Sequence, residues 1–240
     1  MPTDTVQFHF EKVTELNTLA ILKAEWLKSL VAPQDDMWES FTNAATHWQI
    51  KAENKNIGYT CVNDENRLLQ FFVMPKWQHE GPTIFQKFIE EQDIISAMIG
   101  TNNPHCLSLA MHFQTSVTVD TYLFTDAIKV NLKETAGTFS CVTHQDFDSI
   151  VNFYHDSIGA PKSWLNGYLG NLVEKGEVFM LTNNDEILGT CEVRKSKSDP
   201  KVAGIGMITS AQHRKKGLGS FLLGKAKEKA LEWNRAPICS

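Results

Sequence analysis

The residues best suited to chemistry lie near the end of the chain, where a glycine-rich turn follows an apolar stretch. The sequence there is Gly204-Ile-Gly-Met-Ile-Thr-Ser-Ala-Gln-His-Arg-Lys-Lys-Gly-Leu-Gly-Ser220, which predicts a strand, a polar loop and the start of an amphipathic helix. The first N–H groups of a helix lack intrahelical acceptors, and the helix dipole adds partial positive charge there. Glycines at 217 and 219 let an anion approach the backbone, and the run 214–216 is basic. The segment therefore predicts a pyrophosphate site, with a solvated basic run before an ordinary helix as the alternative.

Two other phosphate-binding motifs fail on this segment. Gly219-x-x-x-x-Gly224-Lys225-Ala226 resembles a P-loop up to its last position, where alanine replaces the magnesium-binding Ser or Thr. The dinucleotide fingerprint G-x-G-x-x-G fails because Leu222 stands where its third glycine belongs.

The second half of the chain predicts the elements that position this segment. Hydrophobic periodicity indicates the order β-α-α-β-β-β-α-β. The expected ranges are strand Thr138–Thr143, helices Gln145–Ile158 and Trp164–Glu174, strands Val178–Thr182, Ile187–Arg194 and Val202–Thr209, a helix from Gly217, and a strand from Pro237.

The first half predicts nearly the same order, which indicates an internal duplication. Its Gln78-x-x-Gly81 matches Arg214-x-x-Gly217 at an offset of 136 residues, and the seam falls near Leu132–Gly137. We therefore expect two domains, 1–133 and 134–240. The expected ranges are strand Val6–Val13, helices Leu16–Leu30 and Asp35–Trp48, strands Gln49–Glu53, Ile57–Val62 and Leu68–Met74, helix Thr83–Glu91, strand Ile94–Gly100, helix His105–Phe113 and strand Val117–Phe124.

The hexapeptide Arg214-Lys-Lys-Gly-Leu-Gly219, after a strand and at the start of a helix, resembles the Arg/Gln-x-x-Gly-x-Gly/Ala signature of GNAT-superfamily N-acetyltransferases. The resemblance covers roughly residues 138–240. It implies an α/β fold of two GNAT-like units, each a mixed, mainly antiparallel sheet flanked by helices. It also implies acetyl-coenzyme A (acetyl-CoA) as cofactor, with the pantetheine arm at the strand end and the pyrophosphate at the loop. The implied cofactor-binding residues are Met207, Ile208, Thr209, His213, Arg214, Lys215, Lys216, Gly217, Leu218, Gly219 and Ser220.

The first half looks like a degenerate copy of this domain. Pro82 removes a backbone donor, Thr83 replaces the final small residue, and Glu80 adds a carboxylate where phosphate would lie. Binding of coenzyme A (CoA) is therefore not expected in this half, and a scaffold or substrate-shaping role is.

The resemblance implies direct transfer, in which a neutral amine attacks the thioester without a covalent enzyme intermediate. A backbone N–H near Ile208 or Thr209 is expected to polarise the thioester carbonyl. Glu192 is the best candidate for the catalytic base, because strand alternation places it beside the predicted cofactor strand on one face with Arg194. The alternative is a surface carboxylate paired with that arginine. His213 is a second candidate, although its place in the phosphate loop favours positioning.

The residue that protonates the leaving thiolate is not expected in this sequence. In the family it is often a tyrosine on the helix after the fifth strand, and the chain stops at Ser240, where that strand has just begun. The C-terminal helix and strands of the second domain are thus absent. Three explanations stay open: the sequence is part of a longer protein, a partner chain completes the sheet as in a homodimer, or this copy is short by nature.

Charge, hydrophobic runs and cysteine spacing exclude several classes of partner and site. The 240 residues carry 23 basic and 28 acidic side chains, a formal net charge of −5, which argues against a nucleic-acid partner. No stretch is long and apolar enough to cross a membrane. Five widely spaced cysteines without a C-x-x-C predict neither a metal site nor a disulfide framework, and favour the cytoplasm.

The sequence therefore predicts an acetyl-CoA-dependent N-acetyltransferase that acts on a primary amine of a small molecule or peptide. A non-catalytic acyl-CoA-binding or regulatory module is the alternative.

Overall fold

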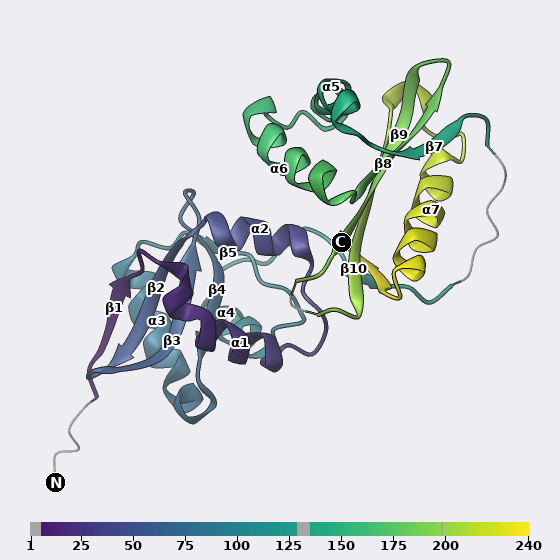
Figure 1. Cartoon of the computed structure of the whole chain (residues 1–240). Coiled ribbons are helices and arrows are strands. Elements are labelled where there is room, and N and C mark those ends of the chain that lie inside the picture. Colours follow the sequence, from purple (N-terminus) through teal and green to yellow (C-terminus); the bar gives the residue numbers. More distant parts are fainter. Residues whose placement is uncertain (1–5, 129–134, 198) are drawn as a thin grey trace, which may run out of the picture. The chain divides into compact units, whose positions relative to one another are not determined.

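The computed structural model describes residues 6–128, 135–197 and 199–240, which form two compact units, Met1–Val119 and Asp120–Ser240 (Figure 1). The predicted domain boundary between residues 133 and 134 lies outside the described residues. Both units are mixed α/β structures in which helices flank a sheet, as the sequence predicted.

The first unit has a five-stranded sheet of order β1-β2-β3-β4-β5, in which only β4 and β5 are parallel. One buried cluster joins α1 to Tyr59 and Phe72, and another joins α3 and α4 to Phe71 and Val73. Helices therefore cover both faces of the sheet. The elements are β1 (Phe8–Lys12), η1 (Leu16–Leu19), α1 (Ala20–Ser29), α2 (Asp36–Ala44), β2 (Thr46–Ala52), β3 (Lys55–Val62), β4 (Arg67–Val73), η2 (Pro75–Glu80), α3 (Gly81–Glu91), β5 (Ser96–Ala97) and α4 (Pro104–Phe113).

The second unit has a six-stranded sheet of order β6-β11-β10-β9-β8-β7, in which only β10 and β11 are parallel. One buried cluster lies under α7 and another under α5 and α6. The elements are β6 (Phe124–Thr125), β7 (Thr138–Cys141), η3 (His144–Asp146), α5 (Phe147–Ile158), α6 (Lys162–Lys175), β8 (Val178–Asn183), β9 (Glu186–Lys195), β10 (Val202–Thr209), η4 (Ala211–His213), α7 (Leu218–Glu232) and β11 (Ala236–Cys239).

Local sequence explains the helix ends of the second unit. Helices α5 and α6 stop at Gly159 and Gly176, both in the left-handed conformation that glycine adopts without strain. The predicted buried stripe of α7 is confirmed, since its members are at most 7% exposed: Leu218, Leu222, Ala226 and Ala230.

The segment after α4 departs from the prediction. The sequence placed a strand at Val117–Phe124 in the first half, but only Phe124–Thr125 is a strand, and it pairs with β11 of the second sheet. The Lys227 ammonium on α7 anchors this segment through the Asp126 carboxylate at 2.5 Å and the Ile128 carbonyl at 2.6 Å. Strand β11 is therefore paired on both sides, with β10 and with β6.

Candidate functional site

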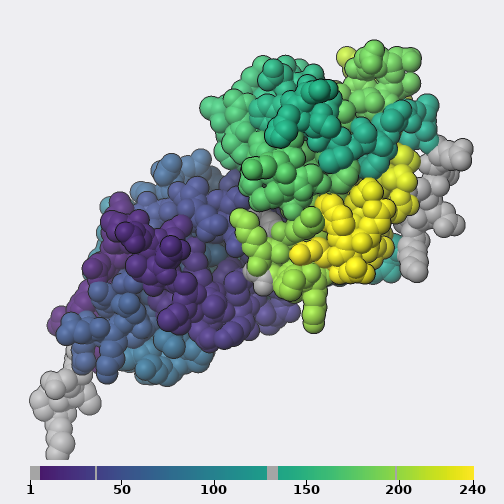
Figure 2. Space-filling view, in the orientation of Figure 1, coloured from purple at the N-terminus to yellow at the C-terminus, as the bar shows by residue number. Residues whose placement is uncertain are grey.

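The N-terminus of α7 is open to solvent and has no capping side chain. Gly217 precedes the helix with φ +84°, a left-handed conformation, and its side chain position is empty within 4 Å. A Cβ on Gly219 would meet only the Thr209 hydroxyl, at 3.7 Å. The basic residues 214–216 and Ser220 are exposed. Figure 2 shows α7, in yellow, at the surface. This end of the helix can therefore accept an anion without displacing protein atoms.

Hydrogen bonds fix the loop that leads into this helix. The Ser210 N–H donates to the Leu188 carbonyl of β9 at 3.0 Å. The ring of His213 contacts the Ser210 hydroxyl through Nδ1 at 2.8 Å, and the Glu186 carboxylate lies 3.7 Å away. Arg214 Nε donates to the Thr209 carbonyl at 3.4 Å. His213 thus helps to hold the loop in place through Ser210 and Glu186.

Strands β10 and β11 separate before β10 ends. Their pairing stops at Gly204 and Ile238, whereas β10 stays paired with β9 as far as Thr209. In an antiparallel ladder, alternate residues point their N–H and C=O groups to opposite sides. Because Ser210 bonds to β9, the backbone groups of Met207 and Thr209 face the side that β11 has left.

The gap beside β10 therefore offers backbone partners to an extended ligand. The sequence also placed Ile208 in the cofactor site. Ile208 differs from Met207 because its backbone N–H and C=O point toward Thr190 of β9 and away from the gap. Its side chain packs against the cluster under α5 and α6. The opening ends at the same loop that presents the basic residues and the uncapped helix.

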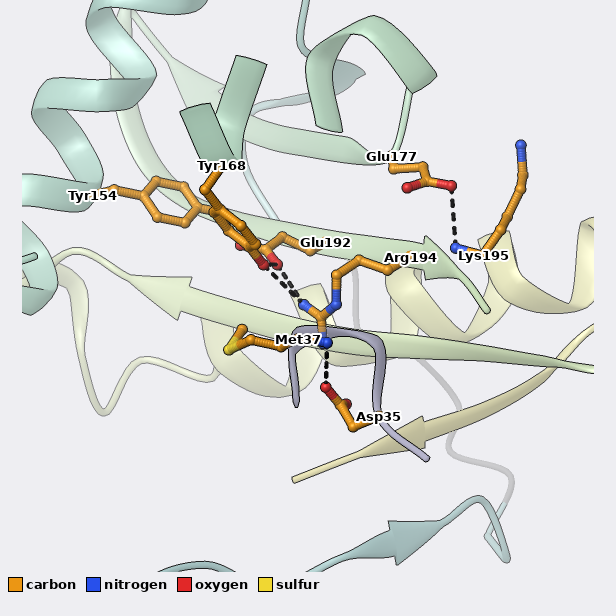
Figure 3. A network of polar contacts seen from close by, with 8 residues as sticks. All are labelled: Asp35, Met37, Tyr154, Tyr168, Glu177, Glu192, Arg194 and Lys195. Carbon is orange, nitrogen blue, oxygen red and sulfur yellow. Dashed lines mark hydrogen bonds and ion pairs between the residues drawn. The ribbon is translucent and has the colours of Figure 1, made fainter. Parts of the chain in front are cut away.

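A buried polar network lies on the face of this sheet that α5 and α6 cover (Figure 3). Tyr154 of α5 donates to Glu192 Oε1 at 2.8 Å, and Tyr168 of α6 donates to Glu192 Oε2 at 2.5 Å. Arg194 Nη1 bonds to the same Oε2 and lies 3.4 Å from the Tyr168 hydroxyl. A Cβ on Gly206 would stand 3.4 Å from Arg194 Nη1, so the missing side chain makes room for the guanidinium.

This network changes the interpretation of Glu192. The side chain is 4% exposed, so it is not the surface carboxylate that the sequence left open, although it does pair with Arg194. Both of its oxygens accept hydrogen bonds from the surrounding side chains. Burial, together with the negative charge of Glu192, raises the pKa values of Tyr154 and Tyr168, which keeps both phenols protonated as donors. The sequence signal for these tyrosines was helical spacing alone, which does not distinguish a network from a core.

Comparisons with protein-family models match both halves of the chain. A model described as "Acetyltransferase (GNAT) domain" matches residues 15–127, and one described as "Acetyltransferase (GNAT) family" matches residues 143–238. The chain holds two GNAT domains in tandem and belongs to the GNAT superfamily. No curated protein matches the sequence.

Solved structures are similar to nearly the whole chain, and one of them is described as a tandem GNAT protein. A GNAT-family acetyltransferase from Colwellia psychrerythraea is 25% identical, with a TM-score of 0.88 over 96% of this chain and 88% of that one. A tandem GNAT protein from the clavulanic acid biosynthesis pathway is 14% identical, with a TM-score of 0.66 over 97% and 89%. A GCN5-related N-acetyltransferase from Sphaerobacter thermophilus is 14% identical, with a TM-score of 0.64 over 98% and 87%.

In the first GNAT domain, α4 lies beside the residues that correspond to the open site of the second. At the offset of 136 residues, Gly81 corresponds to Gly217 and Phe71 to Met207. A Cβ on Gly81 would stand 3.4 Å from the ring of His105 on α4. Cys106 of α4 and Phe71 of β4 are buried in the same hydrophobic cluster. Residues of α4 therefore lie close to both positions in the first domain.

The first GNAT domain also lacks the acidic network. The same offset relates Gln70 to Gly206, and Gln70 pairs across the sheet with Cys61, as Gly206 pairs with Glu192. The Gln70 amide oxygen accepts from the Tyr59 hydroxyl at 3.2 Å and lies 3.9 Å from the Cys61 thiol. A neutral amide and a thiol thus stand where the second domain has a carboxylate.

Among the described residues, no group of three or more histidine, cysteine or acidic side chains is arranged to hold a metal ion. In the same part of the chain, no helix has the length and apolar character to span a bilayer.

Proposed function

We propose that the second GNAT domain binds acetyl-CoA and transfers its acetyl group to a primary amine of a small molecule or peptide. One observation carries the proposal: β10 leaves β11 after Gly204 and then leads into an uncapped helix N-terminus beside three basic residues. The groove and the anion site are therefore continuous. The pantetheine arm of acetyl-CoA is an extended chain with amide groups, which can pair with the free backbone of β10. It ends in a pyrophosphate, whose negative charge suits the basic residues and the helix N-terminus.

The roles of the groove residues follow from their geometry. The N–H groups of residues 218–220 would hold the pyrophosphate, and Arg214, Lys215 and Lys216 would neutralise its charge. The backbone groups of Met207 and Thr209 would pair with the pantetheine amides as a neighbouring strand does. Acetyl-CoA supplies the activated acetyl group, and the protein orients it toward the amine.

Glu192 receives a positioning role in this proposal. A base that takes a proton from the acceptor must reach it directly or through one water. The Glu192 carboxylate is buried and bonded to Tyr154, Tyr168 and Arg194. We therefore propose that Glu192 fixes these side chains beneath the groove, and that the ring of Tyr168, stacked on Trp164 at 4.7 Å, faces the acceptor side.

The test begins with binding. Isothermal titration calorimetry should show one molecule of acetyl-CoA or CoA per chain, because in the first domain Pro82 removes a backbone donor and Glu80 adds a carboxylate where phosphate would lie. Thermal unfolding should show stabilisation, by about 2.7 kcal/mol at a ligand concentration near 100 times Kd. If neither coenzyme binds, the proposal is wrong.

A second measurement separates an enzyme from a binding module. Thiol release from acetyl-CoA is followed with a colorimetric thiol reagent across a library of polyamines, amino acids, amino sugars and peptides. An amine that accelerates release above the protein-free rate supports transfer. Binding without release for any amine supports the acyl-CoA-binding module instead. The five free cysteines fit the reducing cytoplasm that we propose as its location.

A further inference from the structure

Met207 is exposed on a strand whose first half is buried. In β10, residues 202–205 are buried, and the pairing with β11 spans residues 202–204. Beyond that pairing, Met207 is 44% exposed. Among the described residues, Met111 of α4 is the other exposed methionine, at 47%. The exposure of Met207 therefore coincides with the gap that β11 leaves beside β10.

Strand alternation places the Met207 side chain on the face of the sheet that α7 covers. Ile205 belongs to the cluster under α7, whereas Ile208 packs against the cluster under α5 and α6. Met207 is two residues from Ile205 and so shares its face. Thr209, the next residue on that face, lies at the start of α7, because its hydroxyl is 3.7 Å from the position of a Cβ on Gly219. Met207 thus stands between the buried core under α7 and the uncapped end of that helix.

A ligand that pairs with the Met207 backbone would also cover part of its side chain. Backbone pairing holds neighbouring chains about 4.8 Å apart. At that spacing, groups directly opposite each other stand about 4.5–5.5 Å apart at Cβ and are in contact. A pantetheine arm in the gap would therefore contact the thioether of Met207, which is an apolar group.

We propose that Met207 is an oxidation site that regulates the groove, because its sulfoxide weakens CoA binding and bound ligand shields its sulfur. This inference rests on the proposed function. The oxidant is hydrogen peroxide. The sulfur electron pair attacks one peroxide oxygen, so that a sulfur–oxygen bond forms while the oxygen–oxygen bond breaks. The transferred oxygen gives its proton to the departing hydroxide, which leaves as water. Sulfur is oxidised by two electrons, and the peroxide is reduced.

The product explains the expected loss of affinity. A sulfoxide is polar, whereas the thioether that it replaces is apolar. It would set a dipole against the pantetheine arm and would occupy more of the space beside β10. Methionine sulfoxide reductases remove the oxygen again, so the change is reversible.

The first measurement tests the shielding. The whole chain is treated with dilute hydrogen peroxide, with or without saturating acetyl-CoA, which has no free thiol for the peroxide to consume. Peptide mass spectrometry then gives the sulfoxide fraction at Met207 and Met111 over time. Without ligand, the two should be oxidised at similar rates, since oxidation follows exposure. Acetyl-CoA should slow the oxidation of Met207 about tenfold and that of Met111 less than about twofold.

The second measurement tests the regulation. After removal of peroxide, the oxidised wild type should bind acetyl-CoA about five- to tenfold more weakly by calorimetry, and methionine sulfoxide reductases should restore the affinity. Met207→Leu conserves volume and apolar character, so it should bind within about twofold of the wild type and keep that affinity after peroxide. The matched variant Met111→Leu should remain as sensitive as the wild type. Both variants keep all five cysteines, so a loss caused by thiol oxidation would persist in Met207→Leu.

Several results would overturn the assignment of Met207 while leaving the proposed function standing. These are equal oxidation of Met207 with and without acetyl-CoA, an unchanged affinity of the oxidised wild type, a loss that the reductases do not reverse, or a loss that persists in Met207→Leu. Failure of the untreated wild type to bind acetyl-CoA would overturn both.

Discussion

A negative charge at the start of α7 should oppose CoA binding while leaving the fold intact. Ser220 is exposed in the first turn of α7, and no side chain caps that helix. In Ser220→Glu, the new carboxylate lies near the positive end of the helix dipole, which stabilises the ligand-free protein by about 0.3–1 kcal/mol. The same carboxylate repels a bound pyrophosphate. The free energy of unfolding of the ligand-free protein should therefore rise, whereas the affinity for CoA should fall.

The size of the binding loss follows from Coulomb's law. At roughly 6 Å and an effective dielectric constant of about 40, the carboxylate and one phosphate charge repel by about 1.4 kcal/mol. Two phosphate charges give about 3 kcal/mol, or a roughly 100-fold weaker affinity. Calorimetric titration with CoA at about 0.15 M salt measures this loss, and higher salt should reduce it because exposed charges are screened.

The matched control places the same charge at the other end of the same helix. Leu231 is 56% exposed, and eleven residues of helix separate it from Ser220 by about 16 Å, beyond the Debye length of roughly 8 Å. Leu231→Glu should therefore change the CoA affinity less than about twofold. Equal losses in both variants, or no loss in Ser220→Glu, would refute the assignment of the pyrophosphate to this helix.

Three further predictions concern stability, measured by urea unfolding. Lys227→Met should lower the free energy of unfolding by about 1 kcal/mol, because the Asp126 carboxylate and the end of the β6 segment lose their anchor. Glu192→Gln should cost about 3 kcal/mol, since the buried ion pair between Glu192 and Arg194 is lost. His47, buried beside Lys23, has its pKa lowered to about 4 by desolvation, so it is neutral in the folded state at pH 5 and protonated in the unfolded state. Its contribution to stability is present above pH 6.5 and is lost as pH falls through 4, by about 1–2 kcal/mol between pH 7.5 and 5.

Each of these predictions has a control on the same element or at the same position. Lys225→Met removes an exposed ion pair of α7 with Glu228 and should cost less than about 0.5 kcal/mol. Glu186→Gln neutralises a half-exposed carboxylate at the start of β9 and should also cost little. His47→Asn should flatten the pH dependence, and an unchanged slope in that variant would contradict the argument from desolvation.

Periodicity and glycine positions predicted most of the second domain. Helices α5 and α6 end within one residue of the predicted ends, at Gly159 and Gly176, and α7 buries one stripe, as an amphipathic helix does. Glycines and basic residues follow one another in the loop before α7, so the sequence marks this loop, and its role as a pyrophosphate site stays a prediction. Each of these features depends on residues that are close in sequence, so it can be predicted from a short segment.

The features that the sequence could not supply depend on distant pairing. Glu192 was placed on the correct strand face, but its enclosure by Tyr154 and Tyr168 depends on how two helices lie over the sheet. The partner of β11 comes from residues more than 100 positions earlier, on a strand of two residues. Nothing in the composition of Phe124–Thr125 distinguishes it from the rest of a predicted strand that was assigned to the first domain.

The shared use of β6 has a consequence for anyone who divides this protein into pieces. A cut at the seam that sequence similarity suggests, between the two family matches, gives a C-terminal fragment whose sheet ends at an unpaired β11. Exposed strand edges promote aggregation. Aggregation of such a fragment would therefore not show that the domain is inactive. A fragment that begins at Asp120 keeps the edge covered and is the smaller unit to express. The boundary between the two family matches lies after β6, whereas the boundary between the two compact units lies before it.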